Sequence, residues 1–335
     1  MKKTVIKGTG RYVPERVVTN EDLMQWMDTS DEWITQRTGI KQRHWIPEAG
    51  GTCSSDLGFE ASKIALDRAG WKPEDIDFII FATLSPDLDA PGAGCLVQHK
   101  LGLKATPALD IRQQCTGFIY GLATADAYIR SGLASRILFI CAEVHSTLID
   151  ISTRGRDIAT LFGDGAGAVC LEGIETEKPV GVLASVLHSQ GEFAGSLMLK
   201  HPSSRYRQYY TEDIIKIERP RPYMDGKTIF KTAIRRLPEV ANEAMDKAGL
   251  SIDEIDLIIP HQANLRINKA VEKSMDLPEG KIFNNMQRYG NTTAASIPIA
   301  LDEAIEMNLV GSGSRVLFFG LGAGLTWGCV AYSFE

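Results

Sequence analysis

The chain contains an internal repeat, and this repeat constrains its fold more than any other feature of the sequence. Residues 64–80 read IALDRAGWKPEDIDFII, and residues 243–259 read EAMDKAGLSIDEIDLII. Each copy has the pattern of a helix end, an Ala-Gly stop, an acidic turn and an apolar strand. The same shift of 179 residues carries RILFI at residues 136–140 onto RVLFF at residues 315–319. Because chance rarely gives three matches at one shift, we predict two tandem homologous halves.

The apolar runs of both halves are short and nearly continuous, as at residues 78–82, 137–142 and 257–259. Such runs are typical of strands that are buried on both faces. We therefore predict an α/β fold in which each half has a mainly parallel sheet covered by helices.

A polar and charged stretch at residues 173–180 suits a boundary between the halves. The predicted domains are residues 1–175 and residues 176–335. Residues 188–223 are irregular, with several Pro, Tyr and charged residues, and we predict an inserted lobe there within the second half.

Charge and hydropathy exclude two classes of partner. The net charge of −6 and the pI near 5.6 leave no basic surplus for phosphate groups, so we expect no nucleic-acid partner. The most apolar stretch, residues 316–332, is interrupted by glycines and predicts a buried strand, turn and strand. We therefore expect no membrane association.

The chain begins MKKTVIKG, which lacks the apolar core of a signal peptide. Its cysteines include no Cys-x-x-Cys pair, so neither a zinc site nor a disulfide framework is predicted. A cytoplasmic protein with reduced thiols and no bound metal is the expectation. The six cysteines are at positions 53, 95, 115, 141, 170 and 329.

Cys115 is the candidate nucleophile. It lies between the strand-like residues 109–111 and the start of a helix at residues 116–122. The free amides and the dipole at a helix start favour thiolate over thiol, so we expect a lowered pKa for this sulfur. Cys141 and Cys170 lie within apolar runs and are predicted to be structural.

His261 and Asn291 are the candidate partners of this thiol. His261 follows the strand at residues 257–259, and open α/β sheets bind ligands at the carboxyl ends of their strands. Asn291 lies in a glycine turn that leads into a helix. The repeat carries Cys115 onto position 294, so a short gap places Asn291 near its counterpart. We therefore predict that thiol, imidazole and carboxamide converge.

A thiol and an imidazole together favour acyl transfer through a thioester, and neutral His and Asn donors suit a thioester enolate. Asn orienting His in a papain-like protease is an alternative, although duplicated α/β halves are the wrong scaffold for that class. The amides of the glycine-rich loop at residues 320–328 predict one side of an oxyanion hole, with the Cys115 amide as the other. A plain hairpin is the alternative for this loop.

Taken together, these segments resemble the β-ketoacyl-acyl-carrier-protein synthase III family of thiolase-like condensing enzymes. The resemblance covers nearly the whole chain and implies duplicated αβαβα halves that form a five-layered sandwich, in a homodimer. It is carried by SDEWI (30–34), RTGI (37–40), LFGDGAG (161–167), PHQANLRI (260–267), GNTTAASIP (290–298) and GAGLTWG (322–328).

The resemblance also implies the roles of the site residues. Cys115 would take an acyl group from acyl-CoA, and His261 and Asn291 would promote decarboxylation of malonyl-acyl-carrier-protein and hold the enolate. The amides of Cys115 and Ala323 would form the oxyanion hole. The product would be a 3-oxoacyl thioester that initiates fatty acid synthesis, and no metal or redox cofactor would be needed.

Binding residues follow from the same resemblance. Trp33 and Arg156 match positions that sandwich the adenine of CoA, and two further residues that line the same entrance are Arg37 and Asn264. Basic residues that face the acidic carrier protein would be Lys231 and Arg266.

The chain departs from the family pattern near the nucleophile. It reads QQCTG where members commonly read Ala-Cys-Ala/Ser-Gly. Ala90 falls where members that use short primers carry a bulky Phe, which closes the acyl pocket across the dimer interface. We therefore expect a longer or branched primer, because each buried methylene group contributes about 0.8 kcal/mol.

Three alternatives remain open. A specialised condensing enzyme or acyltransferase of secondary metabolism would use the same fold. A thiolase needs a second catalytic cysteine, and Cys329 fits that position poorly because it lies in a strand pattern. A non-catalytic scaffold that binds acyl carrier protein would have no use for Cys115, His261 and Asn291 together.

Overall fold

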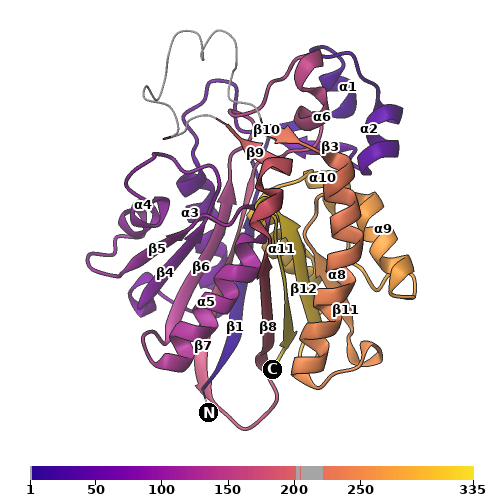
Figure 1. Cartoon of the computed structure of the whole chain (residues 1–335). Coiled ribbons are helices and arrows are strands. Elements are labelled where there is room, and N and C mark those ends of the chain that lie inside the picture. Colours follow the sequence, from indigo (N-terminus) through magenta and orange to yellow (C-terminus); the bar gives the residue numbers. More distant parts are fainter. Residues whose placement is uncertain (1, 201–203, 205–221) are drawn as a thin grey trace.

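Two main sheets stand side by side in the computed structural model, which describes residues 2–200, 204 and 222–335 (Figure 1). The first sheet has the order β1-β7-β6-β4-β5, and the second has the order β11-β12-β13-β8. Their bounds are β1 Lys2–Tyr12, β4 Phe78–Ala82, β5 Ala108–Ile111, β6 Arg136–Glu143, β7 Gly165–Glu175, β8 Gly181–Ser189, β11 Leu257–Pro260, β12 Arg315–Gly322 and β13 Thr326–Ser333.

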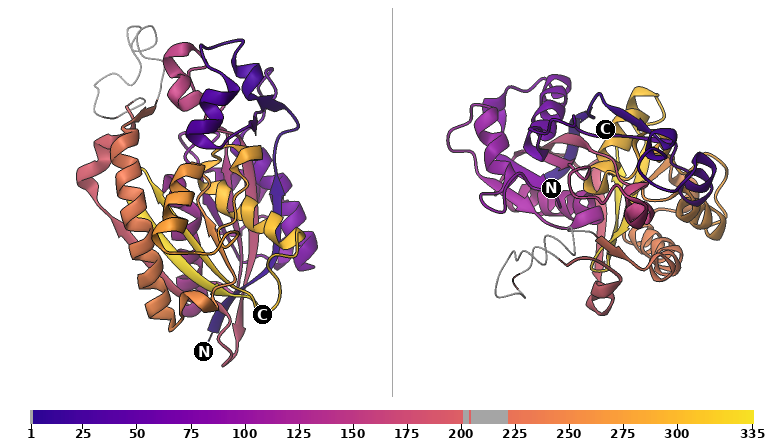
Figure 2. Two further views of the ribbon diagram at one scale, coloured as in Figure 1. Left: turned by 90° about the vertical axis from the view of Figure 1, so that its right-hand side faces the viewer. Right: turned by 90° about the horizontal axis from the view of Figure 1, so that it is seen from above.

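Helices cover both sheets and also fill the space between them (Figures 1 and 2). Helices α5 and α11 contact both sheets, α3 and α4 pack on the first sheet, and α8 packs on the second with α9 beside it. This arrangement confirms the predicted five-layered sandwich of duplicated halves. The bounds are α3 Ser54–Ala69, α4 Ala93–Lys100, α5 Gly117–Ser131, α8 Gly226–Ala248, α9 Leu265–Ser274 and α11 Ser296–Glu306.

The repeat seen in the sequence recurs in the backbone. Strand β12 has the bounds of β6 shifted by 179 residues. Helices α3 and α8 end at glycines separated by the same shift, Gly70 with φ 67° and Gly249 with φ 68°. Only glycine adopts this left-handed conformation without a steric cost, which explains why both Ala-Gly pairs end a helix.

The prediction of mainly parallel sheets is wrong. Strand β4 pairs in parallel with β5 and β6, but β7 runs antiparallel to both β6 and β1. In the second sheet only β11 and β12 are parallel. A continuous apolar run reports burial on both faces, and antiparallel strands share this burial when helices cover both sides of the sheet.

A cap lies at the end of the molecule opposite the two termini (Figure 1). The fully buried Arg43 connects the segments of this cap. Its guanidinium donates hydrogen bonds to the Val18 carbonyl at 3.1 Å, to the Thr160 carbonyl at 2.8 Å and to the Asn20 side chain at 2.8 Å. The cap contains α1 Asn20–Leu23, α2 Asp31–Thr38, α6 Arg156–Ala159, β2 Val17–Thr19 and β3 Gln42–His44.

Only the flanks of the predicted inserted lobe are described. Strand β8 ends at Ser189, and β9 (Leu197–Leu199) pairs with β10 (Pro222–Met224). Residues 201–203 and 205–221 of this prediction lie outside the described residues.

Candidate active site

Cys115 lies in a 3₁₀ turn, Gln114–Thr116, between β5 and α5. Gln114 has φ +46°, a conformation that non-glycine residues adopt rarely. The turn packs closely against β12, where a Cβ added to Gly322 would lie 3.0 Å from the Cβ of Cys115. The short strand, the tight turn and this glycine therefore fix the position of the sulfur.

The pKa of the Cys115 thiol is raised to about 12, so the predicted lowered pKa is wrong. Burial is the largest cause, and the negative charge of Glu143 adds to it. The amides of Cys115 and Ala323 bond to the sulfur and favour the thiolate, but they do not offset its desolvation. The resting protein therefore holds a protonated thiol in front of two backbone amides.

His261 follows β11 and points a proton donor into the site. Its Nδ1 lies 2.7 Å from the Ser296 hydroxyl, which accepts a hydrogen bond from the Gln262 amide at 3.3 Å. The Ser296 proton is thus available to Nδ1, and this assigns the ring proton to Nε2. Nε2 is buried without a partner among the described residues, and burial lowers the pKa of the ring to about 3. His261 is a neutral donor.

Asn291 is held by its backbone and by its side-chain oxygen. Its amide donates to the Leu161 carbonyl at 2.8 Å, and its carbonyl accepts from Gly163 at 3.1 Å. Its Oδ1 accepts the Thr293 amide at 2.9 Å, which orients the NH₂ group. Within the described part of the chain this NH₂ group has no hydrogen-bond acceptor, so Asn291 presents a second neutral donor.

The structure brings these three predicted residues to one cavity of about 150 Å³, which Cys115, His261 and Asn291 all line. Asn264 and Phe230 line the same cavity. One thiol and two uncharged N–H donors, all on buried residues, thus share one space, where hydrogen bonds to a developing oxyanion are stronger than in water.

A shift of 179 residues places the nucleophile turn Gln114–Thr116 on the turn Thr293–Ala295 without any gap. Thr293 has φ +42°, close to the φ of Gln114, and the residue equivalent to Cys115 is Ala294. The expectation that Asn291 itself lies at that helix start therefore needs correction, because it precedes the turn. The two turns pack together, since a Cβ added to Gly117 would lie 2.8 Å from the Cβ of Ala294.

A second cavity, of about 350 Å³, also reaches Cys115, and most of the residues that line it were not predicted from the sequence. It includes Ala323, the predicted second oxyanion donor. We call it the acyl-side cavity, and the residues that line it are Leu84, Arg112, Gln114, Cys115, His145, Leu148, Ile149, Phe162, Ala194, Leu197, Met198, Leu199, Pro222, Thr293, Ala323 and Gly324.

Glu143 is a buried acidic residue near the sulfur that sequence reasoning missed. Its carboxylate accepts hydrogen bonds from the Ser85 hydroxyl at 2.6 Å and from the Leu84 amide at 3.0 Å. Burial nevertheless raises its pKa. The available signal was an acidic residue at the end of the apolar run at residues 136–143, since such a charge is rarely buried without partners.

Four predicted CoA-binding residues lie near one another at the cap. The guanidinium carbons of Arg37 and Arg156 lie 4.2 and 5.2 Å from the Trp33 ring centre, which are cation–π distances. Asn264 donates to the Arg37 carbonyl at 3.0 Å. The cluster therefore joins the cap to the start of α9 beside the first cavity.

The other predicted binding residues lie at the surface. Lys231 on α8 and Arg266 on α9 are exposed, and the Arg266 guanidinium lies 5.8 Å from the ring centre of Phe230, which lines the first cavity. Ala90 is exposed in the loop after β4 and is not among the described residues that line either cavity.

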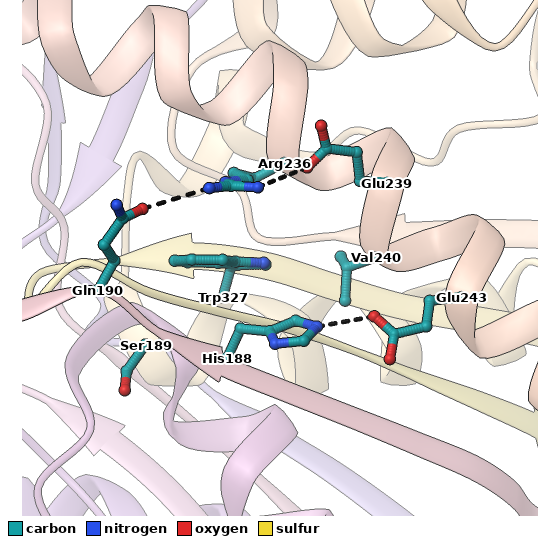
Figure 3. A pocket seen from close by; sticks show the side chains of 8 residues that line it. All are labelled: His188, Ser189, Gln190, Arg236, Glu239, Val240, Glu243 and Trp327. Atoms are coloured by element: carbon teal, nitrogen blue, oxygen red, sulfur yellow. Dashed lines mark hydrogen bonds and ion pairs between the residues drawn. The ribbon is translucent and has the colours of Figure 1, made fainter.

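A further pocket, of about 420 Å³, opens between α8 and the edge of the second sheet (Figure 3). The His188 ring bonds to Glu243 at 2.7 Å, and Arg236 lies over the Trp327 ring and pairs with Glu239 at 2.9 Å. Its charged side chains thus pair with one another. None of the predicted site residues is among the described residues that line it.

The described residues contain neither a metal-binding cluster nor a membrane-spanning helix. No three His, Cys, Asp or Glu side chains there are grouped so as to hold a metal ion. In the same part of the chain, no helix combines the length and the apolar character needed to cross a membrane.

The chain is similar to known proteins in both sequence and structure. Residues 109–191 match the family model described as 3-Oxoacyl-[acyl-carrier-protein (ACP)] synthase III, and residues 245–334 match the model of its C-terminal part. The chain is 44% identical to beta-ketoacyl-[acyl-carrier-protein] synthase III of Fusobacterium nucleatum over 328 residues, or 98% of each chain. Its structure is similar to that of 3-oxoacyl-[acyl-carrier-protein] synthase III from Aquifex aeolicus, with TM-score 0.89, 41% identity and full coverage of both chains.

A priming beta-ketosynthase from the R1128 polyketide pathway is also similar, with TM-score 0.91, 31% identity, and coverage of 100% of this chain and 97% of that one. The matches to family models and to a full-length relative establish the family. The chain belongs to the β-ketoacyl-[acyl-carrier-protein] synthase III family of condensing acyltransferases.

Proposed function

We propose that this enzyme loads an acyl group from acyl-CoA onto Cys115 and condenses it with malonyl-acyl-carrier-protein, giving a 3-oxoacyl thioester that initiates fatty acid synthesis. The observation that carries this proposal is the single cavity shared by the Cys115 thiol and the two neutral donors of His261 and Asn291. This set of groups suits acyl transfer followed by enolate stabilisation.

In the first step the Cys115 sulfur attacks the thioester carbonyl of acyl-CoA. The Cys115 and Ala323 amides, which bond to the sulfur in the resting state, stabilise the tetrahedral oxyanion. The carbon–sulfur bond to CoA then breaks, and the thiol proton leaves with the CoA sulfur. The raised pKa of Cys115 means that its proton is lost as the attack proceeds rather than beforehand.

In the second step the malonyl thioester carbonyl lies between His261 Nε2 and the Asn291 NH₂ group. Both donors are neutral, so neither protonates the carbonyl oxygen before CO₂ leaves. Their hydrogen bonds stabilise the enolate oxygen that forms in this step. The enolate carbon attacks the acyl-cysteine carbonyl, a carbon–carbon bond forms, and the Cys115 thiolate departs and takes up a proton. Neither step includes a net oxidation or reduction, so we propose that no redox cofactor takes part.

The binding roles follow the same scheme. Trp33, Arg37, Arg156 and Asn264 bind CoA at the cap, and Lys231 and Arg266 bind the acyl carrier protein beside the first cavity. Their grouping at the cap and their exposure on α8 and α9 support these roles.

The assembly and the division of the chain are also proposals. We propose a homodimer in which Ala90 from the partner subunit faces the acyl pocket and leaves room for a longer or branched primer. The two homologous units are residues 1–175 and 176–335. This division is supported by β7 ending at Glu175 and β8 beginning at Gly181.

A second candidate function is priming in a specialised pathway. The similarity to a polyketide priming ketosynthase and the polar residues Arg112, Gln114 and His145 in the acyl-side cavity favour it. The chemistry at Cys115 is the same in both cases, and only the primer and the carrier differ.

The test is an assay with radiolabelled acyl-CoA donors of graded chain length and with malonyl-acyl-carrier-protein or malonyl-CoA as acceptor. We expect label on Cys115, release of CO₂ and a 3-oxoacyl product, with faster turnover of a medium-chain donor than of acetyl-CoA. Label on Cys115 without product would contradict the condensing step. Equal turnover of acetyl and medium-chain donors would contradict the longer primer.

A further inference from the structure

The acyl-side cavity contains an imidazole that the proposed chemistry does not use. Most of its walls are apolar, as at Leu148, Ile149 and Phe162, and such walls suit a hydrocarbon chain. His145 lines the same cavity and is 4% exposed. A buried polar ring in an apolar wall has a cost unless each of its nitrogens finds a partner.

One nitrogen of His145 has a partner. Its Nε2 lies 2.8 Å from the Thr293 hydroxyl and 3.9 Å from a carboxylate oxygen of Glu143, and the Thr293 side chain acts to lower the pKa of that carboxyl group. Glu143 already accepts from the Ser85 hydroxyl and from backbone amides, so it acts as an acceptor toward Thr293 as well. The single Thr293 proton therefore goes to Glu143, and Thr293 accepts the proton on Nε2.

The other nitrogen is left as a bare acceptor. Burial lowers the pKa of His145, so its ring is neutral and Nδ1 carries a lone pair. Among the described residues no donor forms a hydrogen bond to Nδ1. Nδ1 nevertheless keeps some accessible surface, since it is not among the fully buried side-chain atoms without a partner. The accessible space beside the His145 ring is the acyl-side cavity.

We propose that His145 is a specificity-determining residue and that the acyl-side cavity selects a primer whose acyl chain carries a hydroxyl group. This proposal rests on the proposed function and names the substrate class of its first step. The primer hydroxyl donates to His145 Nδ1, and the rest of the chain lies against the apolar wall. A plain hydrocarbon primer leaves that acceptor unpaired, and a site built to bond a hydroxyl discriminates strongly against the analogue that lacks it.

The test compares octanoyl-CoA with the 2-, 3- and 8-hydroxyoctanoyl-CoA isomers as donors to Cys115 of the full-length protein. The rate of acyl-enzyme formation is followed by intact-protein mass spectrometry without any malonyl acceptor. We expect at least one hydroxy isomer to be transferred about tenfold faster than octanoyl-CoA, as kcat/KM. If octanoyl-CoA matches or exceeds every hydroxy isomer, the proposal is overturned, and this result needs no variant.

A variant links the preference to the ring. We expect His145→Leu to lose the preference for the hydroxy isomer, whereas His99→Leu, which changes an exposed residue on α4, keeps it. A preference that persists in His145→Leu would assign selection to another group and overturn the role of His145. Failure of every thioester, acetyl-CoA included, to acylate the wild-type enzyme would instead overturn the proposed function, and this proposal with it.

Discussion

The nucleophile turn Gln114–Thr116 and its counterpart Thr293–Ala295 have the same backbone and different chemistry. Both are 3₁₀ turns that begin with a residue at positive φ and lead into a central helix. The first carries Cys115 and the second carries Ala294 at the equivalent position. The duplicated halves therefore provide two equivalent positions, and a sulfur is present at only one of them.

The second half contributes donors in place of a nucleophile. His261 follows β11, the counterpart of β4, and Asn291 precedes the second turn. Because the two turns pack against each other, residues from both halves reach one cavity. We infer that the first half supplies the nucleophile for acyl transfer and that the second half supplies the donors for decarboxylation.

The largest expected effect comes from removing the sulfur from the first turn. Cys115→Ser should lower condensation by about 10⁴-fold, because a serine hydroxyl in this buried site is a far weaker nucleophile than a thiol. Product formation from acyl-CoA and malonyl-acyl-carrier-protein is the measurement. Retention of a tenth of the wild-type rate would contradict the assignment of the nucleophile.

The pKa of Cys115 gives the next largest effect. Since burial raises it to about 12, the thiolate fraction should increase tenfold for each pH unit from 7 to 9. The rate at which iodoacetamide alkylates Cys115, resolved by peptide mass spectrometry, should increase by about 10²-fold over that range. A rate that levels off near pH 7 would show a lowered pKa and contradict the effect of burial.

The contact between the two turns should affect the free energy of unfolding. Gly117→Ala places a methyl group 2.8 Å from the Cβ of Ala294 and should lower the free energy of unfolding by about 1–3 kcal/mol. Gly311→Ala is the matched control, since a Cβ there meets nothing within 4 Å. Urea unfolding of both variants is the measurement, and equal midpoints would show that the turns do not press together.

The smallest effect is expected at the residue that orients His261. Ser296→Ala removes the hydroxyl 2.7 Å from Nδ1 and should lower kcat for condensation by roughly tenfold, with little change in KM or in Cys115 acylation. Ser296→Thr keeps the hydroxyl and should restore most of the rate. Loss of acylation in Ser296→Ala would indicate a general structural defect instead of an effect on His261.

The sequence was sufficient to predict the duplicated fold and the convergence of Cys115, His261 and Asn291 on one site. Cys115 lies in a turn and His261 follows a strand whose positions the repeat defines, and Asn291 lies just before the counterpart turn, so local patterns carried the information. The antiparallel strands were not predicted, because burial on both faces does not record strand direction.

The electrostatics of the site could not be predicted from local patterns. A helix start lowers a thiol pKa in isolation, but the enclosure of Cys115 depends on β12 and on Glu143, which come from distant parts of the chain. The hydrogen bond between His145 and Thr293, next to Glu143, joins the two halves and has no signature in either segment alone.

The assignment of the nucleophile to one half and of the decarboxylation donors to the other is tested most directly by separating the two half-reactions. Wild type and His261→Ala are treated with acyl-CoA, and the mass of each protein is measured by intact-protein mass spectrometry. Malonyl-acyl-carrier-protein is then added, and the masses are measured again. The account predicts that both proteins gain one acyl group on Cys115 and that only wild type loses it as product and CO₂ appear. A His261→Ala protein that never gains the acyl group, or that loses it to product at the wild-type rate, would contradict it.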